Sequence, residues 1–68
     1  MKLRIKFVGF KRSDELVEVG ERTRYIEVLE KLGINPETVV LIRNSTPLPL
    51  DEQVEEGEVT VIRVISGG

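Results

Sequence analysis

Few side chains in this sequence of 68 residues are able to carry out chemistry on their own. The chain contains no His and no Cys, so the most common general base, the thiol nucleophile and the usual zinc ligands are missing. The serines, Ser13, Ser45 and Ser66, have no evident base to activate them. These absences argue against a hydrolytic or redox enzyme, and we expect a protein that is not an enzyme.

Acidic residues gather between positions 51 and 58, where paired-carboxylate catalysis or metal binding would be formally possible. The members are Asp51, Glu52, Glu55, Glu56 and Glu58. Their spacing does not match a calcium-binding EF-hand loop, and nothing nearby completes a closed coordination shell. We interpret the cluster as a solvated turn and expect no bound metal or cofactor.

The remaining candidate for chemistry is the end of the sequence, Gly67-Gly68. A frayed terminus without a function is one interpretation. The other is that a narrow arm of glycines, with Ser66 as its hinge, carries the Gly68 carboxylate into the active site of another protein. A carboxylate is a poor electrophile and must be activated, in practice as an acyl-adenylate made from ATP by another protein. The chain holds the group to be activated and none of the activating machinery, which indicates a substrate or carrier.

The elements that would position this end begin with a strand at residues 2–7, where apolar and charged residues alternate strictly. Turn-forming residues at 9–14 and an extended run at 16–19 complete a predicted hairpin. Apolar residues at helical spacing then predict an amphipathic helix, with Thr23 as its N-cap and Gly33 as its left-handed C-terminal residue.

The second half of the chain returns to the sheet after Asn35-Pro36, which cannot continue a helix. The β-branched run at 38–43 predicts a central strand, and the prolines that flank Leu48 allow only a short edge pairing. Asp51 is placed to cap a brief helical turn that reaches Val54. Residues 59–65 predict the last strand.

This order of elements predicts one α+β domain with a β-grasp fold. The first and last strands lie side by side in the middle of a mixed sheet of four to five strands, and the helix packs across one face. Tyr25 should anchor the core from the helix. We expect residues 1–65 to form the domain and residues 66–68 to form a flexible diglycine tail.

The last and central strands carry large aliphatic residues on both faces, but only one face can pack against the helix. With a period of two, alternate residues point to opposite faces of the sheet. The expected inward set is Val39, Leu41, Val59 and Val61. The expected outward set is Val40, Ile42, Ile62 and Val64. An exposed aliphatic patch beside the tail usually marks a partner site, although a loop or a second copy of the chain could cover it.

Charge and hydropathy argue against nucleic acid and membranes as partners. The net charge is −2, with 12 acidic and 10 scattered basic residues, so nucleic acid is not an expected partner. Lys2, Arg4 and Lys6 share one strand face, which we interpret as solvated. No apolar run approaches the roughly 20 residues of a membrane span, and no secretory segment opens the sequence. We expect a cytoplasmic protein that is monomeric when free.

Taken over its whole length, the sequence resembles the ubiquitin-like β-grasp proteins, and among them the ThiS and MoaD sulfur carriers and the small archaeal modifier proteins. The resemblance rests on five segments. They are the alternating 3–7, the helical 26–33, the strand and turn 39–44, the Glu-rich turn 55–58 and the terminal Val-Ile-Ser-Gly-Gly at 64–68.

The resemblance implies that a ubiquitin-activating-type enzyme joins Gly68 to AMP and that a sulfur donor then converts the end to a thiocarboxylate. The sulfur would pass to a synthase of thiamin or molybdopterin, or to tRNA. In the modifier branch, Gly68 would instead be linked to lysines of target proteins. Ile42, Ile62, Val64 and Ser66 would dock on the activating enzyme. A non-covalent binding module that uses the same patch is the competing class.

One turn departs from the pattern of these carriers, which commonly have Asn-Gly or Asp-Gly after the central strand. Here the turn is Asn44-Ser45. Because Ser adopts a positive φ less readily than Gly, we expect a looser turn or a turn of another type.

Overall fold

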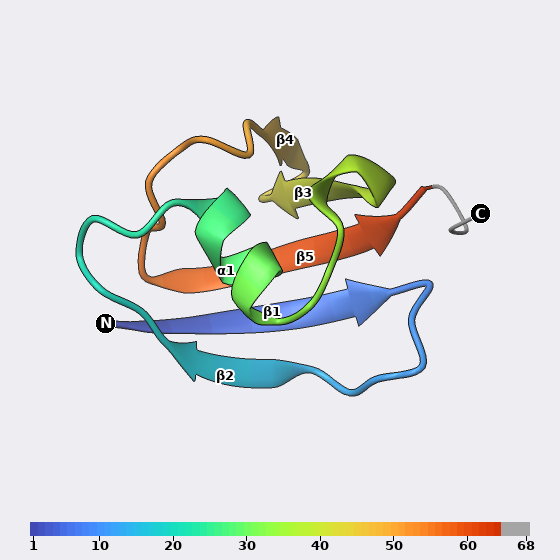
Figure 1. Ribbon diagram of the computed structural model, residues 1–68, viewed down its shortest axis with the longest axis horizontal. Helices are drawn as coiled ribbons and strands as arrows, with labels where there is room; N and C mark the ends of the chain where they lie inside the picture. Colours follow the sequence, from blue (N-terminus) through green and yellow to red (C-terminus); the bar gives the residue numbers. More distant parts are fainter. Residues whose placement is uncertain (65–68) are drawn as a thin grey trace.

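The computed structural model describes residues 1–64 as one sheet crossed by a single α-helix (Figure 1). The strands are β1 (Lys2–Val8), β2 (Glu15–Glu18), β3 (Val39–Arg43), β4 (Thr46–Leu48) and β5 (Gly57–Arg63). The helices are α1 (Tyr25–Lys31) and the 3₁₀ helix η1 (Pro36–Thr38). The predicted tail residues Ser66, Gly67 and Gly68 lie outside the described part of the chain.

The strand order is β2-β1-β5-β3-β4, with β1 and β5 parallel in the middle and the other neighbours antiparallel. This confirms the predicted mixed sheet and its β-grasp arrangement. The carboxyl ends of β1 and β5 lie at the same end of the molecule, together with the β1–β2 loop (Figure 1). Strand β4 contains Pro47 and is followed by Pro49, and it lies at the sheet edge, where a residue without a backbone donor is tolerated.

The core lies between α1 and the face of the sheet that carries the predicted inward residues. Its buried hydrophobic residues are Leu3, Ile5, Tyr25, Val28, Leu29, Ile34, Val39, Leu41, Val54, Val59 and Val61. Tyr25 is only 2% exposed, and its hydroxyl accepts a hydrogen bond from the Glu55 N–H at 3.4 Å. Among the described residues, no charged residue and no polar residue other than Tyr25 is buried in the core, so no charge has to be desolvated there.

The helix begins at Tyr25 with Arg24 as its N-cap, one residue later than an N-cap at Thr23 requires, so that prediction is wrong. Thr23 precedes the helix, and its carbonyl accepts a hydrogen bond from the Val54 N–H at 2.8 Å. The first helical N–H groups, of Tyr25 and Ile26, donate to the carbonyls of Glu52 and Leu50. A distant loop therefore satisfies the amino end of α1, a task that a local cap usually performs.

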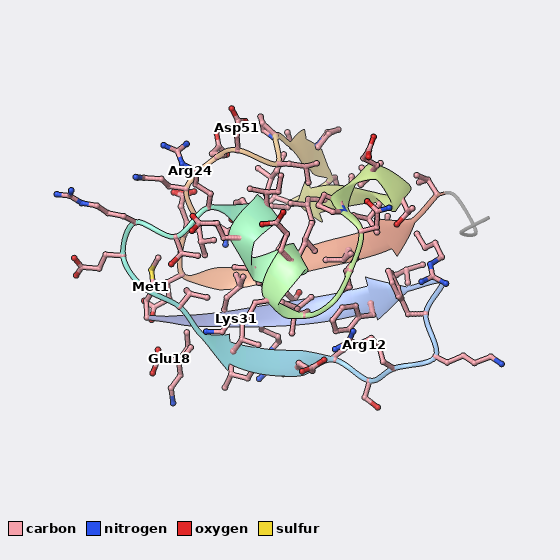
Figure 2. The ribbon with its side chains drawn as sticks, viewed as in Figure 1. Met1, Arg12, Glu18, Arg24, Lys31 and Asp51 are labelled. Carbon is pink, nitrogen blue, oxygen red and sulfur yellow. The ribbon has the colours of Figure 1, made fainter. Side chains whose placement is uncertain are left out.

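The same contacts explain why residues 51–54 form no helical turn, contrary to the prediction for Asp51. The Glu52 N–H donates to the Pro49 carbonyl and closes a turn, while Gln53 pairs with Arg24 in an isolated β-bridge. Arg24 also donates from its guanidinium to the Asp51 carbonyl, and the two residues lie side by side in Figure 2. These tertiary hydrogen bonds occupy the carbonyls that a helical turn would have used.

The carboxyl end of α1 is as predicted. Gly33 has a φ of 76°, the left-handed conformation that glycine adopts without strain. The Ile34 N–H donates to the Leu29 carbonyl and the Gly33 N–H to the Glu30 carbonyl, which together form a Schellman motif. The next segment is a 3₁₀ helix that the sequence reading did not include, with the Asn35 side chain accepting from the Glu37 N–H at 3.0 Å. None of the helices within residues 1–64 is long and apolar enough to cross a membrane.

The β3–β4 turn corrects a further expectation. Asn44 and Ser45 have φ values of 50° and 64°, and they join directly paired residues, Arg43 and Thr46. Two central residues with positive φ are the requirement of a tight type I′ hairpin turn. The turn is therefore not looser than the Asn-Gly turns of the similar carriers, because the pairing of β3 with β4 holds Ser45 in the left-handed region.

Replacing Ser45 with Gly should stabilise the protein. A left-handed conformation costs a residue with a Cβ about 1–2 kcal/mol, and the greater freedom of glycine in the unfolded chain offsets part of that gain. We expect the free energy of unfolding to rise by about 0.5–1 kcal/mol, measured by urea denaturation. Asn44→Gly is the matched control and should change stability less, because Asn tolerates this conformation better. A loss of stability in Ser45→Gly would contradict the proposed strain.

Candidate functional site

The open face of the sheet, opposite α1, carries an aliphatic surface on the half where β1 and β5 end. We define the aliphatic patch as Val8, Val40, Ile42 and Ile62. Ile62 lies between Val8 on β1 and Val40 on β3, because the strand register pairs it with both. Val8 is 48% exposed and Val40 is 36% exposed, while Ile42 and Ile62 are partly buried. The burial of Val39, Leu41, Val59 and Val61 places the expected inward set in the core.

Val8 belongs to this surface, although the alternation predicts a first strand that ends at Phe7. The strand continues to Val8, whose pairing with Ile62 extends the ladder of β1 and β5 by one residue. The period of two also predicts this position, since residue 8 continues the outward series of Lys2, Arg4 and Lys6.

The other half of the open face is charged. Lys2 pairs in register with Glu18 of β2, and Arg4 is flanked by Leu16 of β2 and Glu58 of β5. Lys6 comes next and lies beside Thr60, at the border with the aliphatic patch. The open face thus changes from charged to aliphatic along β1, and the aliphatic half is the one nearest to the end of β5.

The end of β5 fixes the point from which the terminal residues leave the domain. The Val64 N–H donates to the Thr38 carbonyl at 2.9 Å, one residue beyond the last ladder pair of Arg63 with Val39. Val64 is 57% exposed, consistent with the outward position expected for it. Of the predicted docking residues, Ile62 and Val64 are accessible near this end, and Ile42 lies farther along the same face, opposite Thr60 in the middle of β5. Ser66 lies outside the described residues together with Gly67 and Gly68.

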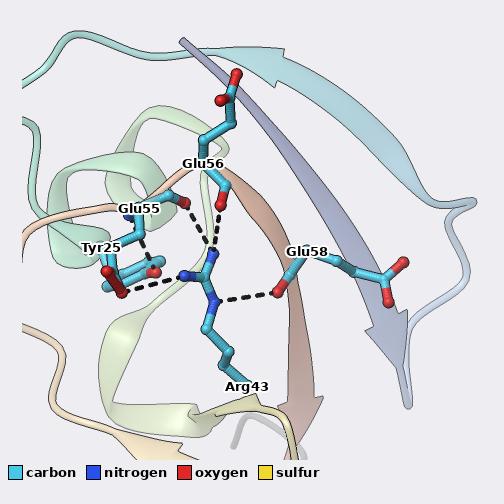
Figure 3. A network of polar contacts seen from close by, with 5 residues as sticks. All are labelled: Tyr25, Arg43, Glu55, Glu56 and Glu58. Carbon is cyan, nitrogen blue, oxygen red and sulfur yellow. Dashed lines mark hydrogen bonds and ion pairs between the residues drawn. The ribbon is translucent and has the colours of Figure 1, made fainter.

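Arg43 has a positioning role at the opposite end of β5, which the sequence reading missed. Its guanidinium donates to the carbonyls of Glu55, Glu56 and Glu58 at 2.8, 3.4 and 3.3 Å, and it lies 3.3 Å from the Glu55 carboxylate (Figure 3). The side chain is only 16% exposed. Arg43 thereby fixes the turn that leads into β5 and so the register of the strand that ends at the tail.

The acidic residues at 51–58 lie in the loop that leads into β5 and at the start of that strand. All of their carboxylates are on exposed residues, and within residues 1–64 no group of acidic side chains is arranged to hold a metal ion. The backbone of the loop contacts Arg43 and the amino end of α1, as described above. The exposure of these residues agrees with their interpretation as a solvated turn.

Comparisons with known proteins are consistent with this geometry. The family described as small archaeal modifier protein 2 matches residues 1–65. An uncharacterized protein of Archaeoglobus fulgidus is 59% identical over all 68 residues of both chains. The sulfur carrier protein TtuB of Thermus thermophilus is 49% identical over 53 residues, which cover 76% of this chain and 82% of TtuB. Small archaeal modifier protein 2 of Haloferax volcanii is 29% identical over the full length of both chains.

Proposed function

Because this chain belongs to the small archaeal modifier protein 2 family, a ubiquitin-like family, we propose that it is a carrier whose working group is the Gly68 carboxylate. The family membership confirms the resemblance expected from the sequence. One observation of this chain supports the proposal most directly: the aliphatic patch lies on the half of the sheet where β5 ends, beside the exit of the terminal residues. An enzyme that docks on the patch would have Gly68 within reach.

The proposed chemistry begins with activation by a ubiquitin-activating-type enzyme. A Gly68 carboxylate oxygen attacks the α-phosphorus of ATP, the bond between the α- and β-phosphates breaks, and pyrophosphate leaves. The product is an acyl-adenylate, in which AMP is a good leaving group. ATP is a substrate of that enzyme, and no cofactor is assigned to the carrier.

Two outcomes follow from the same intermediate. A donor that supplies sulfur at the oxidation level of sulfide can attack the acyl carbon, so that AMP leaves and a thiocarboxylate remains, which delivers sulfur to an accepting synthase or to tRNA. Alternatively, the neutral amine of a target lysine can attack the acyl carbon of Gly68, so that the bond to AMP breaks, AMP and a proton leave, and an isopeptide bond remains. The relatives named a sulfur carrier and a modifier protein support one branch each. We propose that the protein acts in the cytoplasm and is not itself an enzyme in either branch.

The experiment that tests this proposal is the mass of the intact protein after incubation with the adenylating enzyme of the same organism, ATP and a sulfur source. A mass gain equal to replacement of one oxygen by one sulfur is expected for a carrier. Conjugates on cellular proteins, detected in a lysate with the same additions, are expected for a modifier.

A different class of function would leave the mass unchanged. In that case the aliphatic patch would serve a non-covalent binding module, and the Gly68 carboxylate would have no role in chemistry. Binding of the adenylating enzyme without any change in mass would favour this alternative.

A further inference from the structure

Two arginines are stacked on two aromatic rings at the end of the molecule where β1 and β5 finish. The Phe7 and Phe10 rings meet edge to face, with centroids 5.5 Å apart and planes at 69°. The Arg12 guanidinium carbon lies 4.6 Å from the Phe7 centroid, and that of Arg63 lies 4.4 Å from the Phe10 centroid. Figure 2 shows Arg12 on the side of the sheet nearest β2. Each ring therefore holds one cation in place.

The two cations differ in their remaining contacts. The Arg12 guanidinium is satisfied, since it forms an ion pair with Glu15 and also donates to the Leu32 carbonyl. The Arg63 side chain is exposed. Within residues 1–64, its guanidinium forms no ion pair and no side-chain hydrogen bond. Stacking uses the face of a guanidinium and leaves its N–H groups available at the edge. Arg63 is thus a cation that is held in place with its donors unused by the described chain.

The β1–β2 loop is built against Arg63. Gly9 has a φ of 85°, and a Cβ added there would lie 3.2 Å from the Arg63 Cβ. This close approach brings Phe10 over the guanidinium, so the position of Arg63 depends on a glycine that adopts the left-handed conformation. Arg63 is also the last residue of β5, directly before the anchored Val64. The fold therefore fixes a cation at the base of the terminal segment.

We infer that Arg63 determines specificity by binding a carboxylate on the surface of the enzyme that activates Gly68. The inference rests on the proposed function and adds to it a chemical requirement for the partner. A stacked guanidinium presents a planar, preorganised fork of donors, which matches the geometry of a carboxylate. Arg63 pairs with the buried Val39 and follows the buried Val61 by two residues, so its side chain leaves β5 on the α1 face, opposite the aliphatic patch. An enzyme that surrounds the end of β5 would meet the patch on one face and Arg63 on the other, where a charged contact favours the correct partner.

The length of the terminal segment argues against contact with the reacting nucleotide. Four residues follow Val64 in the sequence, and a fully extended segment of four residues spans at most about 14 Å. When Gly68 reaches the α-phosphate inside the active site, Arg63 remains with the domain at the entrance. Its binding partner is therefore a side chain of the enzyme, and substitution of Arg63 should leave the KM for ATP unchanged.

The test is ATP–pyrophosphate exchange by the adenylating enzyme of the same organism, with the full-length chain titrated as substrate. We expect Arg63→Ala to raise the KM for the carrier about tenfold with kcat changed less than about twofold. Arg63→Lys should have an intermediate effect, because it keeps the charge and loses the fork. Arg22→Ala, which removes the same charge from the exposed loop before α1, is the matched control and should behave as wild type.

Salt dependence separates recognition from a merely structural role. If Arg63 meets a carboxylate, the KM of the wild type should rise with ionic strength more steeply than the KM of Arg63→Ala. Equal KM values for wild type and Arg63→Ala, or equal salt responses, would overturn the inference while the proposed function stands. If wild type supports no pyrophosphate exchange at all, the proposed function fails and this inference fails with it. A rise in the KM for ATP would point to the nucleotide and would also overturn the inference.

Discussion

Addition of one alanine after Gly68 should abolish formation of the acyl-adenylate and leave the free energy of unfolding unchanged. The extra residue moves the carboxylate by up to about 3.5 Å and places a Cβ beside the reacting carbon. A displacement of about 1 Å from the reactive geometry is sufficient to cost on the order of 100-fold in rate, so we expect a loss of at least that size. The buried core residues extend only from Leu3 to Val61, so the added residue should not affect folding.

The measurements are ATP–pyrophosphate exchange with the adenylating enzyme and urea denaturation of the variant alone. A variant extended by one glycine separates the two causes, because it lengthens the chain equally and adds no Cβ. Exchange at the wild-type rate in the alanine variant would contradict the proposal that Gly68 is the activated residue. A large fall in stability would instead show that the end of the chain contributes to the fold.

The strands could be predicted from the sequence because alternation is a local signal, and the central place of the first and last strands followed from the connection that a helix after a hairpin requires. Residues 2–7 carry a strict period of two, and the position of Gly33 marks the end of the helix. The error at Thr23 has a different origin. The carbonyls that satisfy the first turn of α1 come from Leu50 and Glu52, which are distant in the sequence, and a local capping rule does not include them.

The turn at Asn44-Ser45 shows tertiary structure overriding a local preference. The propensity of serine disfavours a positive φ, but the direct pairing of Arg43 with Thr46 leaves room for only two turn residues. A short edge pairing after the central strand is predicted from the sequence, whereas the positive φ that this pairing imposes on Ser45 is not. Local propensity was the weaker constraint at this position.

The patch was predictable in part, and the arginines were not. The period of two identifies Ile42 and Ile62 as outward residues once Val59 and Val61 are assigned to the core. The roles of Arg43 and Arg63 depend on contacts between segments, namely the turn at 55–58 and the ring of Phe10. An arginine in a strand carries no sequence signal for such contacts. The docking roles of Ile42, Ile62, Val64 and Ser66 stay predictions.

Replacement of Ile62 with Asp should weaken recognition by the adenylating enzyme without unfolding the protein. Ile62 is at the centre of the aliphatic patch, between Val8 and Val40, where interface residues usually contribute most to binding. A charge there would lose apolar contact and would be desolvated in the complex, so we expect the KM for the carrier to rise by about 30-fold or more. In the free protein the position is only partly buried, and the substitution should lower the free energy of unfolding by about 1 kcal/mol.

The matched control is Leu16→Asp, which introduces the same charge on the same face of the sheet but outside the patch. Leu16 is 54% exposed on β2, beside Arg4 in the charged half of the open face. We expect it to react almost as wild type, because the charge is tolerated there and lies away from the end of β5. Equal losses in the two variants would mean that net charge, and not the patch, governs docking. Unfolding of Ile62→Asp would mean that this residue supports the core, whereas an unchanged KM would remove the aliphatic patch from the proposed interface.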